Sequence, residues 1–168
     1  MSYNLVYYGN PTLASVAERV EKIDDNIISV IGEMYDIMYS EKGVGLAAPQ
    51  INLGKRIIVI DTGENRNNKI ALINPEIKKF SDTVEPYEEG CLSLPKLWRD
   101  VIRPTEVSVK GVTPKGDEIE LDASGFFARV LQHEIDHLNG ILFIDRIEKY
   151  LKDEIRTELK KIKKLNKK

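Results

Sequence analysis

The stretch GFFARVLQHEIDHL, residues 125–138, constrains the fold of this chain more than any other. Each residue of a helix advances about 100°, so apolar residues three and four apart form stripes along its surface. One stripe carries Phe126 and Val130 beside the two histidines of the chain. The second stripe consists of Phe127, Leu131, Ile135 and Leu138. Because a helix that is apolar around most of its circumference must be covered on several sides, we predict a central buried helix that ends at Gly140.

The segments around this helix predict the rest of the architecture. Pro75 and Pro86 indicate sheet edges or bulges among the strand-like runs in the middle of the chain. The turn sequence TPKG at 113–116 indicates a hairpin. Strands are expected at 56–61, 70–74, 76–81, 83–89, 105–112 and 117–122, and further helices at 10–20, 24–40 and about 147–165.

Strands in the middle with helices at both ends favour an α+β domain over a βαβ alternation. We expect one domain over residues 1–168, with mixed or antiparallel strands packed around the central helix. N-terminal helices precede the strands, and a basic C-terminal helix and tail occupy 147–168.

Composition excludes several classes of protein. The chain is 42% hydrophobic and 31% charged with a net charge of −2, which is typical of a globular protein that does not bind nucleic acid over its whole surface. No run approaches the roughly 18 apolar residues of a membrane span, and the start MSYNLVYYGN lacks the features of a secretory signal. We therefore expect a cytoplasmic location, no membrane partner and no sequence-specific nucleic-acid partner.

The only histidines, His133 and His137, lie four apart on the central helix, with Glu134 between them. Residues i and i+4 share one helix face, so the two imidazoles can bind one metal ion. Glu134 lies about 100° round the helix, where it can act as a general base on a metal-activated water. The alternative is a pair of ordinary helix histidines.

A catalytic metal site needs a third protein ligand and an open position. The carboxylates after His137, such as Glu154 and Glu158, lie in a lysine-rich helix and are expected to face solvent. Cys91, the single cysteine, lies in EEGCLSLP on a turning segment and would complete a three-ligand site. The alternative is that Cys91 is a small core residue.

Three motifs now stand together in order: GVGLAAPQ (43–50), EGCLSLP (89–95) and QHEIDH (132–137). They resemble the peptide deformylases, whose motifs run G-x-G-x-A-A-x-Q, E-G-C-L-S and Q-H-E-x-D-H. The resemblance covers essentially the whole chain and is to the bacterial form with a helical C-terminus. Only KLWRDVI (96–102), around Trp98, follows no pattern that we can match.

The resemblance implies an enzyme that removes the formyl group from the N-formyl-methionyl end of new polypeptides. Its metal, typically Fe(2+), would be held by Cys91, His133 and His137, although Zn, Ni or Co also suit these ligands. Glu134 would be the general base and acid. The remaining implied roles are oxyanion stabilisation by Gln50 and the N–H of Leu92, and pairing of an extended peptide with backbone around Gly45, Glu89 and Gly90.

An unbranched methionine side chain needs an apolar slot, for which Val44, Phe126 and Val130 are the candidates. A zinc metallopeptidase is the main rival, and it predicts internal cleavage with no role for Cys91. A metal-binding module without catalysis predicts that Glu134 is dispensable. A thiol hydrolase would use Cys91 as its nucleophile, but no separate Cys–His pair supports it.

The C-terminal segment 145–168 carries most of the excess positive charge. It has ten Lys or Arg against five Asp or Glu, while the other 144 residues have fifteen against twenty-two. Such a segment is either a solvated helix end or a docking site for the ribosome, whose RNA phosphates attract Lys and Arg.

Overall fold

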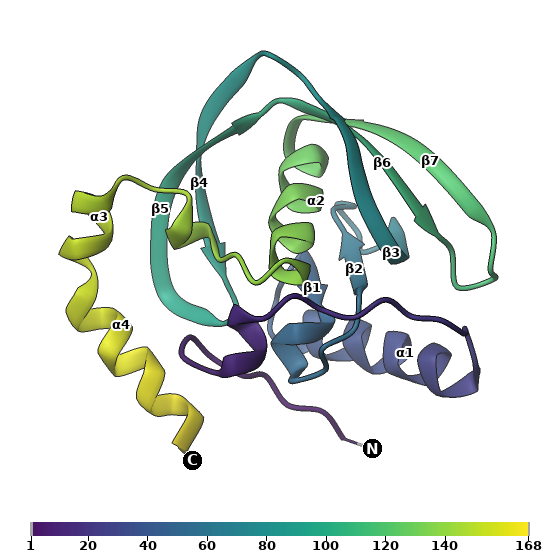
Figure 1. Cartoon of the computed structure of the whole chain (residues 1–168), viewed down its shortest axis with the longest axis horizontal. Coiled ribbons are helices and arrows are strands. Elements are labelled where there is room, and N and C mark those ends of the chain that lie inside the picture. The colour runs from purple at the N-terminus through teal and green to yellow at the C-terminus, as the bar shows by residue number, and fades with distance from the viewer. Residues whose placement is uncertain (1, 168) are drawn as a thin grey trace.

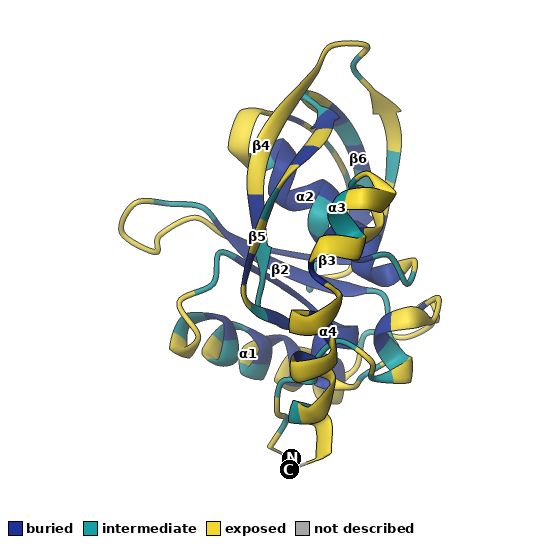
Figure 2. Cartoon of the chain, turned by 90° about the vertical axis from the view of Figure 1, so that its left-hand side faces the viewer, coloured by how far each residue is buried: buried dark blue, intermediate teal, exposed yellow. Residues whose placement is uncertain are grey.

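The computed structural model describes residues 2–167, in which two antiparallel sheets surround one helix (Figure 1). That helix is α2 (Gly125–Leu138), and it lies between the pair β4–β5 and the strands β6 and β7 (Figure 1). Most of α2 is buried (Figure 2). The prediction of a central buried helix in an α+β fold is confirmed.

The larger sheet has five strands in the order β1-β2-β3-β6-β7. All neighbouring strands in it run antiparallel. The strands β6 and β7 form the expected hairpin around TPKG. The bounds are β1 Gly45–Ala47, β2 Ile57–Asp61, β3 Lys69–Phe80, β6 Glu106–Val112 and β7 Glu118–Ser124.

Both faces of this sheet are covered at β2, which explains why every residue of β2 is buried. Alternate residues of a strand point to opposite faces. Ile58 and Ile60 pack with the apolar side of α2, while Ile57 and Val59 pack with α1 (Asp25–Ser40). The sheet therefore separates two apolar clusters, and α2 is held against one of its faces.

The second sheet consists of β4 (Val84–Cys91) and β5 (Leu94–Pro104). A tight turn at Leu92 and Ser93 joins them, so that Cys91 pairs with Leu94 at the end of the hairpin. This geometry agrees with the turning segment expected around Cys91. It also shows that KLWRDVI, which matched no pattern, belongs to strand β5.

The C-terminal segment is helical but broken. Helix α3 (Lys149–Glu154) ends before Ile155, and α4 (Arg156–Lys163) begins after it. Ile155, Leu159 and Ile162 are buried against the β5 side of the molecule. The single helix expected over 147–165 is therefore two short helices, and their apolar side packs on the rest of the molecule.

Two other expectations need correction. The segment 10–20 forms only a short 3-10 helix, Pro11–Ala14, although the side chain of Asn10 caps it as expected. The two strands predicted on either side of Pro75 are one strand, β3, with a register shift between Ile73 and Glu76. Pro75 therefore marks a bulge inside the strand, not its end.

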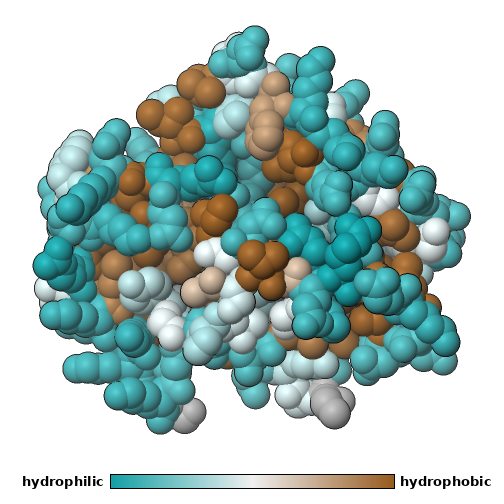
Figure 3. All heavy atoms as spheres, viewed as in Figure 1, coloured by the Kyte–Doolittle hydropathy of each residue, from teal (hydrophilic) through white to brown (hydrophobic). Residues whose placement is uncertain are grey.

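The face of the molecule seen in Figure 1 is mostly hydrophilic, with hydrophobic side chains in small groups among polar ones (Figure 3). Among residues 2–167, none of the helices combines the length with the apolar character that crossing a bilayer requires.

Candidate metal centre and active site

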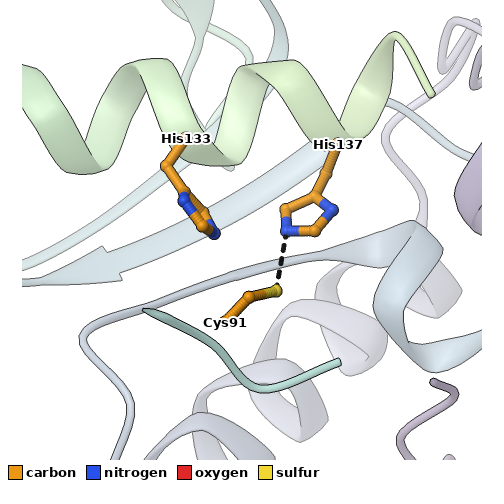
Figure 4. Close-up of side chains that lie close together, drawn as sticks. All are labelled: Cys91, His133 and His137. Atoms are coloured by element: carbon orange, nitrogen blue, oxygen red, sulfur yellow. Dashed lines mark hydrogen bonds between the residues drawn. The ribbon is translucent and has the colours of Figure 1, made fainter. Parts of the chain in front are cut away.

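Three side chains from two elements converge beneath α2 (Figure 4). His133 and His137 project from the same face of the helix, and Cys91 meets them from the end of β4. One donor atom from each residue lies within 4.8 Å of the other two. The Cys91 Sγ and His137 Nε2 atoms are 3.3 Å apart. The sequence prediction that these residues lie together is confirmed.

The spacing of these donors fits a shared metal ion. Ligand bonds of about 2.3 Å to sulfur and about 2.0–2.1 Å to nitrogen, at a tetrahedral angle, place the two donor atoms about 3.5 Å apart. The observed separation of 3.3 Å between Sγ and Nε2 is close to this value. One thiolate and two imidazoles are ligands that suit Zn, Fe(2+), Co or Ni.

Unpaired polar atoms also concentrate here. Within residues 2–167, the buried side-chain atoms that lack a hydrogen-bond partner are Glu134 Oε2 and His137 Nδ1. Buried polar atoms in native proteins are rarely left unpaired, so Glu134 Oε2 indicates that a further polar group completes the site. His137 Nδ1 lies on the side of its ring away from Cys91, so it does not bear on the centre. This arrangement fits a metal centre with an adjacent water.

The pKa of each histidine is shifted by its surroundings. Burial lowers the pKa of His137 well below its ordinary value, which favours the neutral imidazole that binds metals. Burial also opposes a charge on His133, but hydrogen bonds with Cys91 and Glu89 outweigh it and raise its pKa. The surroundings of His133 therefore favour a positive charge at this place.

Glu89 orients His133. Its Oε1 atom lies 2.9 Å from Nδ1 of His133, which leaves Nε2 of that ring for the metal side. Arg103 donates two hydrogen bonds to the Glu89 carboxylate, at 2.6 and 3.0 Å, and Arg129 donates another at 2.7 Å. Burial raises the pKa of Glu89, but the bonds from His133 and Arg103 overcome this and hold it at about 2.

The charge network extends from Arg103 to α2. Arg103 Nη1 donates to Asp136 at 2.8 Å, and Arg146 donates to both oxygens of the same carboxylate. Arg103 and Asp136 are buried, as is Glu89, so these bonds fix the β4–β5 pair to the histidine-bearing helix. These bonds make Asp136 a supporting residue of the centre and not a ligand.

Glu134 lies beside the metal ligands without joining them. It is only 4% exposed, and burial raises its pKa to about 7. A carboxylate with a pKa near the working pH can both accept and return a proton. A methyl group added at Gly45 would lie 2.5 Å from the Glu134 Oε1 atom, so only glycine leaves room for this carboxylate.

Gln50 approaches from the other side of the centre. Its Nε2 atom donates to Cys91 Sγ at 3.5 Å and to Ser93 Oγ at 3.3 Å. Its Oε1 atom accepts a hydrogen bond from the Ala47 N–H, which fixes the amide orientation. The Gln50 amide donor therefore faces the same space as the metal ligands.

A cleft of about 1090 Å³ opens above the centre. His137 is 1% exposed and does not line it, so this ligand lies behind the cleft floor. Every other site residue expected from the sequence lines the cleft: Val44, Gly45, Gln50, Glu89, Gly90, Cys91, Leu92, Phe126, Val130, His133 and Glu134.

Three roles were not foreseen from the sequence. Only the backbone around Glu89 was expected to have a role, at the substrate, but the bond of its side chain makes it a positioning residue for His133. Arg103 and Arg129, which hold Glu89, lie in no recognised motif. Arg129 stands between the buried residues Ala128 and Val130, which is a local signal. Arg103 stands between the exposed Ile102 and the half-buried Pro104, so nothing in the sequence around it signalled its role.

A Cys-His-His donor set with an uncoordinated glutamate at the floor of an open cleft defines the class as a metal-dependent hydrolase. A family model described as polypeptide deformylase matches residues 2–153. This chain belongs to the peptide deformylase family, and by homology its activity is that of a peptide deformylase.

Individual relatives agree over nearly the full length. A peptide deformylase of Brachyspira hyodysenteriae is 49% identical, over 97% of this chain and 90% of that protein. Peptide deformylase 1 of Pseudomonas syringae is 41% identical over 97% of both chains. The crystal structure of a Legionella pneumophila peptide deformylase superimposes with a TM-score of 0.91 at 37% identity, covering 100% of this chain and 99% of that one.

Proposed function

We propose that this chain hydrolyses the N-formyl group of formyl-methionyl peptides with one divalent metal ion held by Cys91, His133 and His137. The observation that carries the proposal is the convergence of these three donors beside the unpaired Glu134 carboxylate. Residues 1–168 would act as one catalytic domain, because α2 packs with one sheet and is ion-paired to the other.

The metal, when bound, supplies Lewis-acid chemistry that can lower the pKa of a water from about 15.7 to near 7. Glu134 takes the proton of that water as its oxygen adds to the formyl carbon. The Gln50 amide and the Leu92 N–H donate to the oxygen that becomes negatively charged. Glu134 then gives the proton to the nitrogen of the formamide, and the C–N bond breaks. The products are formate and a peptide with a free amino terminus.

The substrate would enter as an extended strand beside Gly45 and Gly90. Both glycines line the cleft; Gly45 begins β1, and Gly90 lies one residue before the end of β4. Main-chain hydrogen bonds to such strands give affinity, and pockets give side-chain selectivity. Val44, Phe126 and Val130 line the same cleft and would form the slot for the methionine side chain.

Formate release from a formyl-Met tripeptide by anaerobically purified protein tests the activity. We expect formate and the free tripeptide as the only products. A zinc metallopeptidase, the rival function, would instead cut inside unformylated peptides. Internal cleavage with no formate would overturn our proposal in favour of that rival.

We propose Fe(2+) as the native metal and Cys91 as one of its ligands. The ligand is tested by a variant, and the identity of the metal by the lifetime of activity in air. Cys91→Ser should weaken metal binding sharply, because a hydroxyl is a much poorer ligand than a thiolate. Metal content by mass spectrometry after dialysis measures this loss. In the wild-type protein, activity should decay in air with Fe(2+) and persist with Ni or Co, and equal lifetimes for all three metals would contradict iron.

We further propose that the enzyme works in the cytoplasm on nascent chains and docks on the ribosome through its basic C-terminus. The excess of Lys and Arg after residue 145 supports docking. Lys164 and Lys167 are exposed, so Lys164→Glu with Lys167→Glu should weaken co-sedimentation with ribosomes at low salt. Lys115→Glu, in the β6–β7 turn, is the control, and equal binding by all variants would exclude docking.

A further inference from the structure

The cleft continues well past the metal centre. Its near end includes Glu134 and Val130, while its far end is lined by α4 and by the N-terminal segment. Both elements also approach β5, which connects the far end of the cleft to Cys91 through the 92–97 stretch (Figure 1). One continuous surface therefore joins the reaction centre to the C-terminal helix.

The volume of the cleft exceeds what one residue requires. Pockets for drug-sized ligands measure about 300–1,000 Å³, and a formyl-methionyl group is at the small end of that range. The cleft of about 1090 Å³ is therefore large enough for several residues of a peptide. An extended chain advances about 3.3 Å per residue, so further residues lie beyond the reacting end.

The far lobe is apolar at its base and charged at its rim. Its apolar side chains are Leu5, Tyr7, Pro95, Ile162 and Leu165. Its charged side chains are Glu41, Lys42, Lys96, Glu158 and Lys161. Three lysines against two glutamates leave little net charge, so apolar contacts must dominate what this lobe binds.

The walls of the lobe are fixed in place. Ile162 is 6% exposed and packs with β5 residues in the core cluster that also contains Leu159. The Asn166 side chain accepts a hydrogen bond from the Tyr7 N–H and donates to the Tyr7 and Tyr8 carbonyls. A preformed apolar surface binds a flexible chain at a smaller entropic cost than a mobile one.

We propose that the lobe formed by α4 and the N-terminal segment binds apolar side chains of the substrate downstream of its first three residues. This inference rests on the proposed function, and continuity of the lobe with the catalytic cleft identifies the occupant. The C-terminal helix thus contributes to substrate binding as a wall of the cleft. Remote contacts of this kind raise kcat/KM for long substrates over short ones.

The test compares a three-residue formyl-Met peptide with a six-residue one that carries leucines at positions four to six. In the wild-type protein, we expect kcat/KM for formate release to be about tenfold higher for the longer peptide, which corresponds to about 1.4 kcal/mol. Leu165→Ala should remove most of this advantage. Using the ratio of the two peptides cancels general losses of folded protein.

Ile147→Ala is the matched control. Ile147 and Leu165 are both partly buried members of the same apolar cluster, but only Leu165 lines the cleft. The control should keep the long-to-short ratio. A ratio near one in the wild-type protein, or an equal loss in both variants, would overturn the inference, whereas no formate from either peptide would refute the proposed function itself.

A crosslinking experiment tests the same contact without a variant. A six-residue formyl-Met peptide with a photoreactive phenylalanine at position five should crosslink to residues 158–165 or 5–7, as mapped by mass spectrometry. Crosslinks confined to β6 and β7 would contradict the inference.

Discussion

Gly45 and Glu134 illustrate how closely the site is packed at the scale of single residues. A Cβ at Gly45 would meet the Glu134 carboxylate at 2.5 Å, and that carboxylate is buried and cannot swing into solvent. Gly45→Ala should therefore displace the proposed general base while leaving the metal bound. A misplacement of about 1 Å costs on the order of 100-fold in rate, so kcat for formate release should fall by about that factor.

Gly54→Ala is the control for this prediction, because nothing lies within 4 Å of a Cβ built there. It should keep both kcat and metal content. If Gly45→Ala retained full activity, Glu134 would have an alternative position, and the steric argument would be wrong.

The role of Glu134 itself is tested by Glu134→Gln, which keeps the shape of the side chain and removes its proton-accepting group. Loss of a general base typically costs about 10²–10⁴ in rate, so formate release should fall by that range while metal content stays at the wild-type level. Metal loss in proportion to activity would instead make Glu134 a ligand.

At the scale of elements, the central feature is the set of buried charges between β4–β5 and α2. Glu89 on β4 has a pKa of about 2 in the folded protein, against 4.5 as an ordinary side chain. A carboxylate with a depressed pKa contributes stability above its unfolded pKa and loses it as the pH falls toward the folded value. At about 1.36 kcal/mol per unit, Glu89 accounts for up to about 3 kcal/mol, lost between about pH 4.5 and pH 2.

Glu89→Gln should therefore flatten the acid side of the stability curve. We expect urea unfolding of the metal-free variant to be less stable than wild type at pH 7, with a smaller decline between pH 5 and pH 2. The Glu106→Gln variant, whose carboxylate is exposed on β6, should follow the wild-type curve. Parallel curves for all three proteins would show that Glu89 is not the group that titrates.

The elements that sequence periodicity predicted are those whose apolar pattern is regular. Helix α2 and helix α1 have apolar stripes at helical spacing, and both formed within a residue or two of the expected bounds. Strand β5 was not predicted, because Arg103 occupies one of its inward positions and interrupts the apolar alternation. That arginine is satisfied only by carboxylates distant in sequence, which no local pattern reveals.

The site was predictable for a different reason. Cys91, His133 and Glu134 have side chains whose chemistry is read from residue type and motif, and the structure places them together. The positioning role of Glu89 and the contribution of α4 to the cleft depend on tertiary contacts. The charge pattern of the C-terminal segment suggested a docking tail, but it gave no sign that α4 lines the cleft.

At the scale of the whole molecule, the C-terminal segment holds the N-terminal segment in place. Asn166 is hydrogen-bonded to Tyr7 and Tyr8, and Ile162 is buried in the β5 cluster. Deleting residues 160–168 should therefore lower the free energy of unfolding by about 2–5 kcal/mol, the usual cost of losing a buried Ile side chain. For a protein of this size that corresponds to a Tm lower by about 4–20 °C.

Calorimetry of the truncated and full-length proteins checks this prediction. The Lys164→Glu, Lys167→Glu protein is the control, because it changes charge and keeps Ile162 and Asn166. Its Tm should stay within about 2 °C of wild type. An unchanged Tm after truncation would mean that the C-terminal segment contributes nothing to the core.

The attachment of Cys91 to a separate two-stranded ribbon has a kinetic consequence. Two strands alone are marginally stable, so β4–β5 is the unit that opens most easily once its ion pairs to α2 break. Each opening would carry Cys91 away from both imidazoles, so that a bound metal would keep two protein ligands in place of three. The dissociation rate of the metal and the hydrogen-exchange rate of the β4–β5 amides should then rise together across any series of variants in the ribbon.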